Sequence, residues 1–269
     1  MDYPVQTMIN GINVNYSITG DQGPWIVMSH SLGCDLAMWD RQLDALQSEY
    51  RLLRYDTRGH GQSEGSEPPY TLELLADDAL ALMDHVGVDK AHWLGFSMGG
   101  MIGQVFALKN PERLHSLILA DTTSEHTSTP HSMWAERIRI AREEGVQALV
   151  GPAIGRWFTE RFRAEDPDET RRIATMIGDT SVNGWCGCCA AIADVQTTNR
   201  LHEIACPALV IVGEYDIGTP LDAALTIHRN LKESTLVVIS DAAHMTCVEQ
   251  PEQFNRALKQ FLSSVRPAN

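Results

Sequence analysis

Short apolar runs alternate along the chain with longer stretches in which apolar residues recur every three or four positions. Short apolar runs are typical of buried strands, whereas the three- and four-residue spacing is typical of amphipathic helices. The runs predict strands at residues 5–9, 12–18, 25–28, 52–55, 91–94, 114–120, 208–212 and 236–239. Strands that alternate with helices form a mostly parallel sheet with helices on both faces, so we predict an α/β fold.

The helical spacing predicts helices between these strands, at residues 36–46, 71–86, 101–108, 221–231 and 254–265. Local signals indicate some of the boundaries. Asn10 and Gly11 form the dipeptide that favours a tight hairpin turn between the first two strands. Thr71 is a suitable N-cap for the helix that follows it.

The alternation stops between about residue 121 and residue 200, where the spacing predicts only helices, at residues 133–144, 146–158, 167–177 and 185–195. Asp166, Pro167 and Glu169 have the arrangement of a helix start, with proline at the first helical position. An all-helical block inside an α/β pattern indicates an inserted cap. We therefore predict an α/β core of residues 1–121 and 201–269 and a helical cap of residues 122–200.

The composition of the chain limits its possible partners. The 269 residues suffice for one large domain with an insertion, and the formal net charge of −14 opposes binding to nucleic acid or to an anionic membrane surface. The first ten residues have neither the basic nor the apolar segment of a signal peptide, and no apolar run is long enough to span a bilayer. We expect a cytoplasmic protein whose partner is a small molecule; the sequence does not set its oligomeric state.

The six cysteines do not form a metal-binding pattern. Cys186, Cys188 and Cys189 lie close together in the sequence, but zinc sites usually need C-x2-C pairs with a second pair or with histidines at a set distance. We expect reduced thiols on a helix instead. The chain also lacks a phosphate-binding loop and a dinucleotide fingerprint, so we expect no cofactor and no bound metal.

Residues 95–99 form a G-x-S-x-G motif, with Ser97 at its centre, between a predicted strand and a predicted helix. A sharp strand-to-helix turn holds such a serine in a strained conformation and presents its hydroxyl above the end of the strand. The start of the helix adds free N–H groups and a positive dipole end. Ser97 is therefore the candidate nucleophile; the alternative is a glycine-rich turn that contains a serine by chance.

A serine nucleophile needs a base and an acid that orients the base. In an open parallel sheet these groups come from loops at the carboxyl ends of the strands. His244 and Asp216 lie in two such loops, and the order Ser97, Asp216, His244 is that of an α/β-hydrolase. Glu214, in the same loop as Asp216, and Asp121, at the end of an earlier strand, are alternative acids.

Two backbone N–H groups are candidates for an oxyanion hole. Met98 follows the nucleophile at the start of the helix, and Leu32 lies in the loop after the strand at residues 25–28. The other histidines with predicted roles are His30 and His60, which we expect to support loop geometry, and His126 and His131, which we expect to be solvated.

These motifs resemble those of the 3-oxoadipate enol-lactonases of aromatic catabolism, a branch of the α/β-hydrolases. The likeness covers nearly the whole chain, and it is carried in the core by residues 31–33, 53–61, 95–100, 242–244 and 249–251 and in the predicted cap by residues 156–159 and 188–192. The family's nucleophile, acid and base correspond to Ser97, Asp216 and His244. One departure is His30, where these lactonases often have asparagine.

The resemblance implies hydrolytic opening of an enol-lactone that carries a carboxylate, through an acyl-enzyme on Ser97. Such a substrate needs a cation, and residues 137–172 contain eight arginines and seven acids. Trp134 and Arg137, near the start of the first cap helix, are the candidate substrate-binding residues, because this helix is expected to overhang Ser97. The alternatives are a short-chain carboxylesterase, a carbon–carbon bond hydrolase, and a signal receptor that retains the hydrolase fold.

Overall fold

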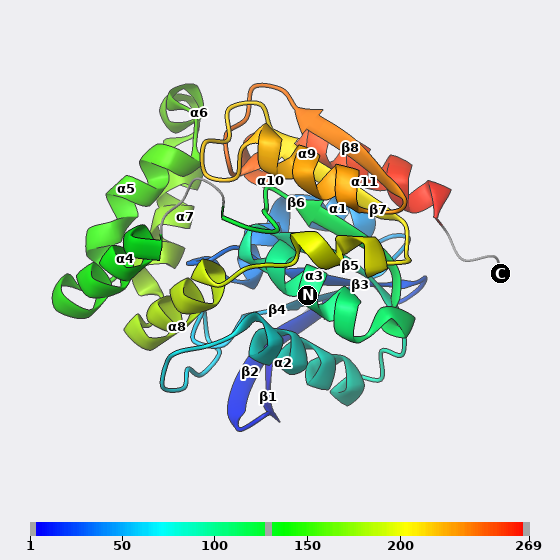
Figure 1. Cartoon of the computed structure of the whole chain (residues 1–269), viewed down its shortest axis with the longest axis horizontal. Helices are drawn as coiled ribbons and strands as arrows, with labels where there is room; N and C mark the ends of the chain where they lie inside the picture. The colour runs from blue at the N-terminus through cyan, green and yellow to red at the C-terminus, as the bar shows by residue number, and fades with distance from the viewer. Residues whose placement is uncertain (1–3, 127–130, 266–269) are drawn as a thin grey trace.

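A single sheet forms the centre of the computed structural model, which describes residues 4–126 and 131–265 (Figure 1). Its strands are β1 (Val5–Ile9), β2 (Ile12–Thr19), β3 (Trp25–Ser29), β4 (Arg51–Tyr55), β5 (Ala91–Phe96), β6 (Leu114–Ala120), β7 (Ala208–Gly213) and β8 (Ser234–Ile239). They lie in the order β1-β2-β4-β3-β5-β6-β7-β8. β2 is antiparallel to both of its neighbours, and all other pairs are parallel, so the predicted mostly parallel sheet is confirmed.

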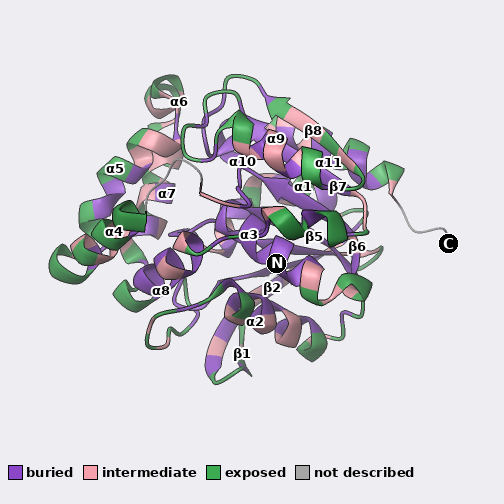
Figure 2. Cartoon of the chain, viewed as in Figure 1, coloured by how far each residue is buried: buried purple, intermediate pink, exposed green. Residues whose placement is uncertain are grey.

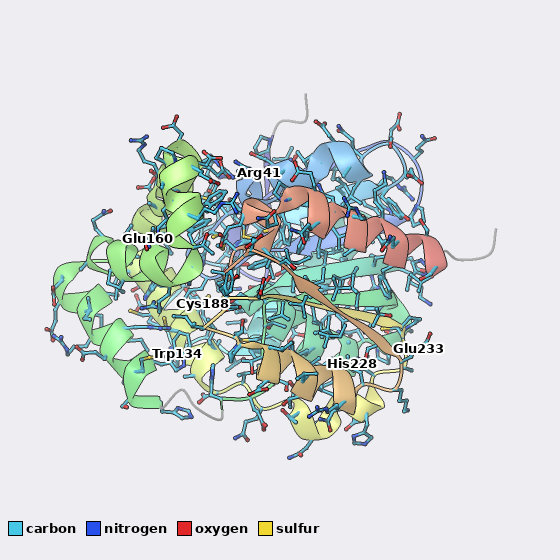
Figure 3. All side chains as sticks on the ribbon, turned by 90° about the horizontal axis from the view of Figure 1, so that it is seen from above. Arg41, Trp134, Glu160, Cys188, His228 and Glu233 are labelled. Atoms are coloured by element: carbon cyan, nitrogen blue, oxygen red, sulfur yellow. The ribbon has the colours of Figure 1, made fainter. Side chains whose placement is uncertain are left out.

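Helices cover both faces of the sheet. α1 (Asp40–Leu46) and α11 (Pro251–Ser264) pack together on one face, while α2 (Leu72–His85), α3 (Met98–Lys109) and α9 (Leu221–Asn230) cover the other. Figure 3 shows α11 (red) and α1 (blue) on one side of the strands and α9 on the other. Within the described residues, no helix is long and apolar enough to cross a membrane.

Between β6 and β7 the described chain consists of helices and the loops that join them. The helices there are α4 (His131–Glu144), α5 (Gln147–Trp157), α6 (Glu160–Glu165), α7 (Pro167–Asp179) and α8 (Val182–Ala193), called the cap helices below. They lie together at one end of the sheet, on the left in Figure 1. Residues 127–130 of the predicted cap, and residues 1–3 and 266–269 of the predicted core, lie outside the described residues.

Two short α-helices were not predicted. α6 has six residues, of which only Phe162 has a large apolar side chain, and α10 (Thr246–Glu249) has four. Neither is long enough to show a helical period. The stretch predicted as one helix at residues 36–46 is instead a 3-10 turn, η1 (Leu36–Trp39), followed by α1, because Trp39 leaves helical geometry at φ −89° and ψ 4°. Two further 3-10 turns are η2 (Pro111–Arg113) and η3 (Thr198–Glu203).

Local sequence signals explain several boundaries. Asn10 and Gly11 both have positive φ, as the tight turn between β1 and β2 requires. The Thr71 hydroxyl caps α2 by accepting a hydrogen bond from the N–H of Leu74 at 3.1 Å. The Asp166 side chain caps α7 by accepting from the N–H of Glu169 at 3.1 Å, and Pro167 is the first helical residue.

The central strands are buried along their whole length. Every residue of β5 and of β7 is buried, as Figure 2 shows in purple. Ser97 therefore lies at the end of a strand that packing fixes on both faces. The cysteine cluster lies on α8, where Cys186, Cys188 and Cys189 are buried free thiols, in agreement with the prediction.

Candidate active site

Ser97 occupies the turn between β5 and α3 in a strained conformation, with φ 50° and ψ −111°. A Cβ atom at Gly95 would lie 2.2 Å from the Gly99 carbonyl oxygen, and one at Gly99 would lie 2.0 Å from that of Ser29. Only glycine fits at these two positions. The Thr122 hydroxyl donates to the Ser97 carbonyl at 2.7 Å and helps to hold the turn.

His244 lies in the loop after β8 and contacts both Ser97 and Asp216. Its Nε2 is 3.1 Å from the Ser97 Oγ, and its Nδ1 is 2.8 Å from the Asp216 Oδ2. A carboxylate can only accept a hydrogen bond, so Nδ1 carries the proton and Nε2 is left to accept from the serine hydroxyl. The structure thus brings together the three residues that the sequence singled out from distant loops.

The Asp216 carboxylate is held by its own loop. Its Oδ1 accepts hydrogen bonds from the N–H groups of Gly218 at 2.7 Å and Thr219 at 3.0 Å. The Thr219 hydroxyl donates to Oδ2 at 2.7 Å. Burial alone would raise the pKa of Asp216, but the adjacent His244 and these donors hold the pKa below its ordinary value. The sequence analysis missed Thr219; the available signal was that an aspartate in a turn accepts from the N–H two residues on, here that of Gly218.

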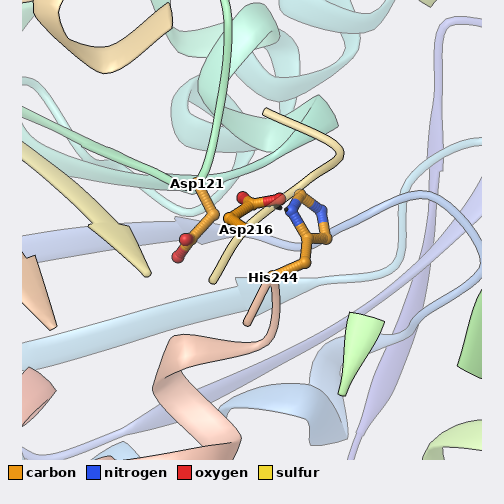
Figure 4. Close-up of side chains that lie close together, drawn as sticks. All are labelled: Asp121, Asp216 and His244. Carbon is orange, nitrogen blue, oxygen red and sulfur yellow. Dashed lines mark hydrogen bonds and ion pairs between the residues drawn. The ribbon is translucent and has the colours of Figure 1, made fainter. Parts of the chain in front are cut away.

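The two alternative acids do not hydrogen-bond to the imidazole. Asp121, at the end of β6, accepts hydrogen bonds from the Gly213 N–H at 2.9 Å and from the Thr246 hydroxyl. Burial and the nearby Asp216 raise its pKa. Glu214 is exposed and accepts from the N–H of Asp241 at 3.1 Å. Figure 4 shows the Asp216 carboxylate facing the imidazole and Asp121 beside it.

Asp121, Asp216 and His244 also have the spacing of metal ligands, with one ligand atom of each within 4.8 Å of the others. All four carboxylate oxygens already accept hydrogen bonds from other residues of the chain. A metal ion there would compete with these donors for the carboxylates and with the Nδ1 proton for His244. The group therefore fits a hydrogen-bonded acid–base arrangement better than a metal site.

A cavity of about 300 Å³ opens in front of Ser97 and His244. The core contributes Leu32 to its wall, and the cap helices contribute Trp134, Arg137, Arg156 and Trp157. Both candidate substrate-binding residues, Trp134 and Arg137, therefore line the same cavity as the candidate nucleophile. Figure 3 labels Trp134 on α4.

Arg137 and Arg156 are the two arginines of this cavity, and neither has a carboxylate within 4.0 Å in the described part of the chain. The Arg137 guanidinium lies over the Trp134 ring. Burial lowers the pKa of Arg137 to about 10, with a contribution from Arg156, so the group stays protonated at neutral pH. Four other cap arginines pair with acids on their own helices, namely Arg139, Arg161, Arg171 and Arg172.

The backbone around the two candidate oxyanion donors fits that role. Leu32 lies in the cavity wall, and its N–H donates no hydrogen bond within residues 4–126 and 131–265. Met98 is the first residue of α3, where backbone N–H groups have no helical partner. His30 supports this loop as expected, because its Nδ1–H donates to the Ser31 carbonyl at 2.7 Å while its Nε2 accepts from the Thr57 N–H at 2.9 Å.

One histidine prediction was wrong. His126 is not solvated: its Nε2–H donates to the Ile192 carbonyl at 3.0 Å, its ring lies 5.5 Å from that of Trp134, and it lines the cavity. Burial lowers its pKa. The loop after β6 places it against α8, a long-range contact that the local sequence does not show. His131 is exposed, as predicted, and His60 is fully buried.

Comparisons with known proteins show the family and the fold of the chain. Residues 24–251 match the model of the alpha/beta hydrolase fold family. The chain is 34% identical over 249 residues to 3-oxoadipate enol-lactonase 2 of Acinetobacter baylyi, covering 92% of each chain. It is 31% identical over 254 residues to a putative carbamate hydrolase of Agrobacterium fabrum, covering 91% of this chain and 95% of the relative. It is also similar to the crystal structure of the enol-lactonase from Burkholderia xenovorans LB400, with a TM-score of 0.93, 34% identity, and coverage of 96% of this chain and 100% of that one.

Proposed function

The chain belongs to the alpha/beta hydrolase fold family, and from this premise we propose that it is a serine hydrolase that opens a small lactone bearing a carboxylate, as in the hydrolysis of 3-oxoadipate enol-lactone. The observation that carries the proposal is the pair of guanidiniums, Arg137 and Arg156, in the cavity of Ser97. A partly buried cation without a partner is costly unless a ligand supplies the anion. Because the chain carries a net charge of −14, an anionic substrate needs such local cations.

In the proposed reaction, the Ser97 Oγ attacks the lactone carbonyl while the His244 Nε2 takes its proton. Asp216 stabilises the resulting imidazolium, and the N–H groups of Leu32 and Met98 bind the oxyanion. The ring C–O bond breaks, and the enolate oxygen, which stays attached to the acyl chain, receives the proton from His244. A water molecule then gives a proton to His244 and attacks the acyl-enzyme; the bond between the Ser97 Oγ and the acyl carbon breaks, His244 returns the proton to Oγ, and the free acid leaves.

The cap helices supply the specificity in this proposal. We divide the chain into a hydrolase core of residues 1–121 and 201–269, which contributes the reacting groups, and a cap of residues 122–200, which contributes Trp134, Arg137 and Arg156. A lactone with one carboxylate could place the carbonyl at Ser97 and the carboxylate at the guanidiniums. We also propose that this reaction belongs to aromatic catabolism, in the β-ketoadipate pathway, and the similarity to enol-lactonases supports this.

A substrate panel tests the proposal. We expect kcat/KM for a carboxylated enol-lactone to exceed that for a neutral lactone of equal size by at least about tenfold, since a charge-assisted contact contributes roughly 1.5–3 kcal/mol. The panel should include p-nitrophenyl acetate, a carbon–carbon hydrolase substrate and a carbamate, because one relative is named a putative carbamate hydrolase. Preference for any of the last three would overturn the lactone assignment. A single burst without steady turnover on every substrate would favour the receptor alternative.

A further inference from the structure

Glu249 is a buried carboxylate that joins the cap helices to the loop of His244. It lies on α10 and is 6% exposed. Its Oε1 accepts a hydrogen bond from the Ala243 N–H at 2.9 Å, directly before His244. Its Oε2 accepts from the Thr159 hydroxyl at 2.7 Å and from the Thr159 N–H at 3.2 Å. One side chain therefore binds two segments that are 90 and 6 residues away from it.

Two further contacts connect the same segments. The N–H of Met245 donates to the Trp157 carbonyl at 3.0 Å. The Trp157 ring lies 5.9 Å from the His244 ring and lines the cavity. The end of α5, which carries Arg156, is thus attached to both sides of His244. A displacement of this part of the cap would move the imidazole relative to Ser97.

We propose that Glu249 is a positioning residue that couples the location of the cap to the location of His244. This inference rests on the proposed role of His244 as the base. Glu249 acts through the Ala243–His244 backbone and does not touch the reacting atoms. Its carboxylate is suited to this task because one oxygen accepts from the core loop while the other accepts twice from the cap, an arrangement that a neutral amide cannot reproduce.

The charge of Glu249 also acts on His244. Three carboxylates lie near this imidazole, those of Asp216, Asp121 and Glu249. The guanidiniums of Arg137 and Arg156 line the same cavity as His244. Arg41 donates to the Val248 carbonyl of α10. Burial raises the pKa of Glu249, and the bonds from Thr159 and Ala243 oppose that increase. Attraction to His244 opposes it as well, so the base and this carboxylate act on each other by charge as well as through the backbone.

Glu249→Gln tests the coupling in the full-length protein. p-Nitrophenyl acetate is the assay substrate, because it needs no carboxylate site and so does not depend on the proposed lactone. We expect kcat to fall about tenfold, since small misplacements of a catalytic group are costly. We expect the proton NMR resonance of the His244 Nδ1–H, which donates to Asp216, to move from its wild-type position because the imidazole is displaced. Glu252→Gln removes the same charge from an exposed position three residues away, and it should change neither quantity.

Thr159 provides a test that leaves the charge in place. Thr159→Val removes the hydroxyl donor, so we expect a smaller loss of kcat, about threefold, with a smaller change in the His244 Nδ1–H resonance. Thr159→Ser should restore the wild-type rate. In the double variant with Glu249→Gln, the loss should be less than the product of the two single losses, because both changes remove the same bond.

These outcomes separate the inference from the proposed function. If the wild-type protein hydrolyses no ester, the proposed function fails, and the His244 Nδ1–H resonance still measures whether Glu249→Gln displaces the imidazole. A Glu249→Gln variant with wild-type kcat and a wild-type Nδ1–H resonance, but a lower melting temperature, would show that Glu249 is only structural and overturn the inference. If Glu249→Gln does not fold, an unchanged kcat in Thr159→Val overturns it instead.

Discussion

The guanidinium of Arg137 lies 4.3 Å from the ring centroid of Trp134 on the same helix, and both side chains line the cavity of Ser97. The indole face attracts the cation and holds it in place without neutralising its charge. Arg137 is therefore positioned but remains available to an anion. This arrangement differs from that of Arg139, two residues later, which pairs with Glu136 and Glu143 on the exposed side of α4.

Arg137→Met should separate anion recognition from chemistry. Methionine keeps an apolar stem and removes the guanidinium, so kcat/KM for a carboxylated lactone should fall by about ten- to a hundredfold. A neutral ester should lose less than about threefold, because Ser97 and His244 are unchanged. Arg139→Met is the matched control on the same helix and should leave both values unaltered. Equal losses on the charged and the neutral substrate would contradict the role of Arg137.

Ser97→Ala should abolish hydrolysis and preserve the fold. The hydroxyl is the group that contacts His244, and alanine fits the space beside Gly95 and Gly99. Loss of a triad nucleophile usually lowers kcat by more than about a thousandfold. Steady-state rates and the melting temperature should be measured together. Residual activity above about a thousandth of wild type in a folded variant would remove Ser97 from the nucleophile role.

Asp216→Asn and Asp121→Asn should differ strongly in rate. The asparagine amide in Asp216→Asn would favour the wrong imidazole tautomer, so we expect kcat to fall by up to about 10⁴-fold. Asp121→Asn disturbs the bonds to Gly213 and Thr246 but makes no bond to His244, so we expect about tenfold or less. Both variants should be assayed at saturating substrate. A larger loss in Asp121→Asn would assign the orienting acid to β6.

The buried histidines should make stability depend on pH. Burial lowers the pKa of His60 to about 3, and the neighbouring His30 contributes, whereas an unfolded histidine has a pKa of about 6.5. Above about pH 6.5 the ring is neutral in both states. Below that pH the unfolded state binds a proton that the folded state does not bind, so stability falls as the pH drops towards 3, by about 1.4 kcal/mol per unit.

Urea unfolding at pH 7.5 and pH 5.0 measures this effect. The wild-type free energy of unfolding should fall by about 2 kcal/mol more than that of His60→Gln over this interval. His131→Gln, at an exposed histidine, serves as the control and should behave as wild type. An identical pH dependence in His60→Gln and wild type would show that His60 is not held neutral.

Gly184→Ala should disturb the contact between α8 and the core. A Cβ atom at Gly184 would lie 2.1 Å from the Gly59 carbonyl oxygen, and overpacking of this kind costs typically about 1–3 kcal/mol. Gly155→Ala, in α5, is the matched control because no atom lies within 4 Å of its added Cβ. There the better helix propensity of alanine should stabilise by up to about 1 kcal/mol. Equal melting temperatures for the two variants would contradict the close contact.

Local sequence patterns predict the architecture and indicate the candidate reacting groups. Strands and helices follow from hydrophobic periods that are local, and all eight described strands lie within two residues of their predicted bounds. The strand-to-helix turn at Ser97 can also be predicted from local sequence, because its geometry requires the glycines on either side. Asp216 and His244 could be proposed as the acid and the base because the carboxyl ends of parallel strands lie at one edge of the sheet. This holds for any arrangement of the cap.

The tertiary structure shows which of these groups touch and which guanidiniums have no carboxylate partner within the described residues. The contact of His244 with Asp216 instead of Asp121 depends on how two loops fold against each other. The surroundings of Arg137 and Arg156 depend on where the cap helices meet the core. Glu249 and Thr159 are 90 residues apart, and no pattern within either segment predicts their bond. His126 was misjudged for the same reason: burial and pairing are set by contacts between distant segments, whereas a sequence pattern reports only the preferences of neighbouring residues.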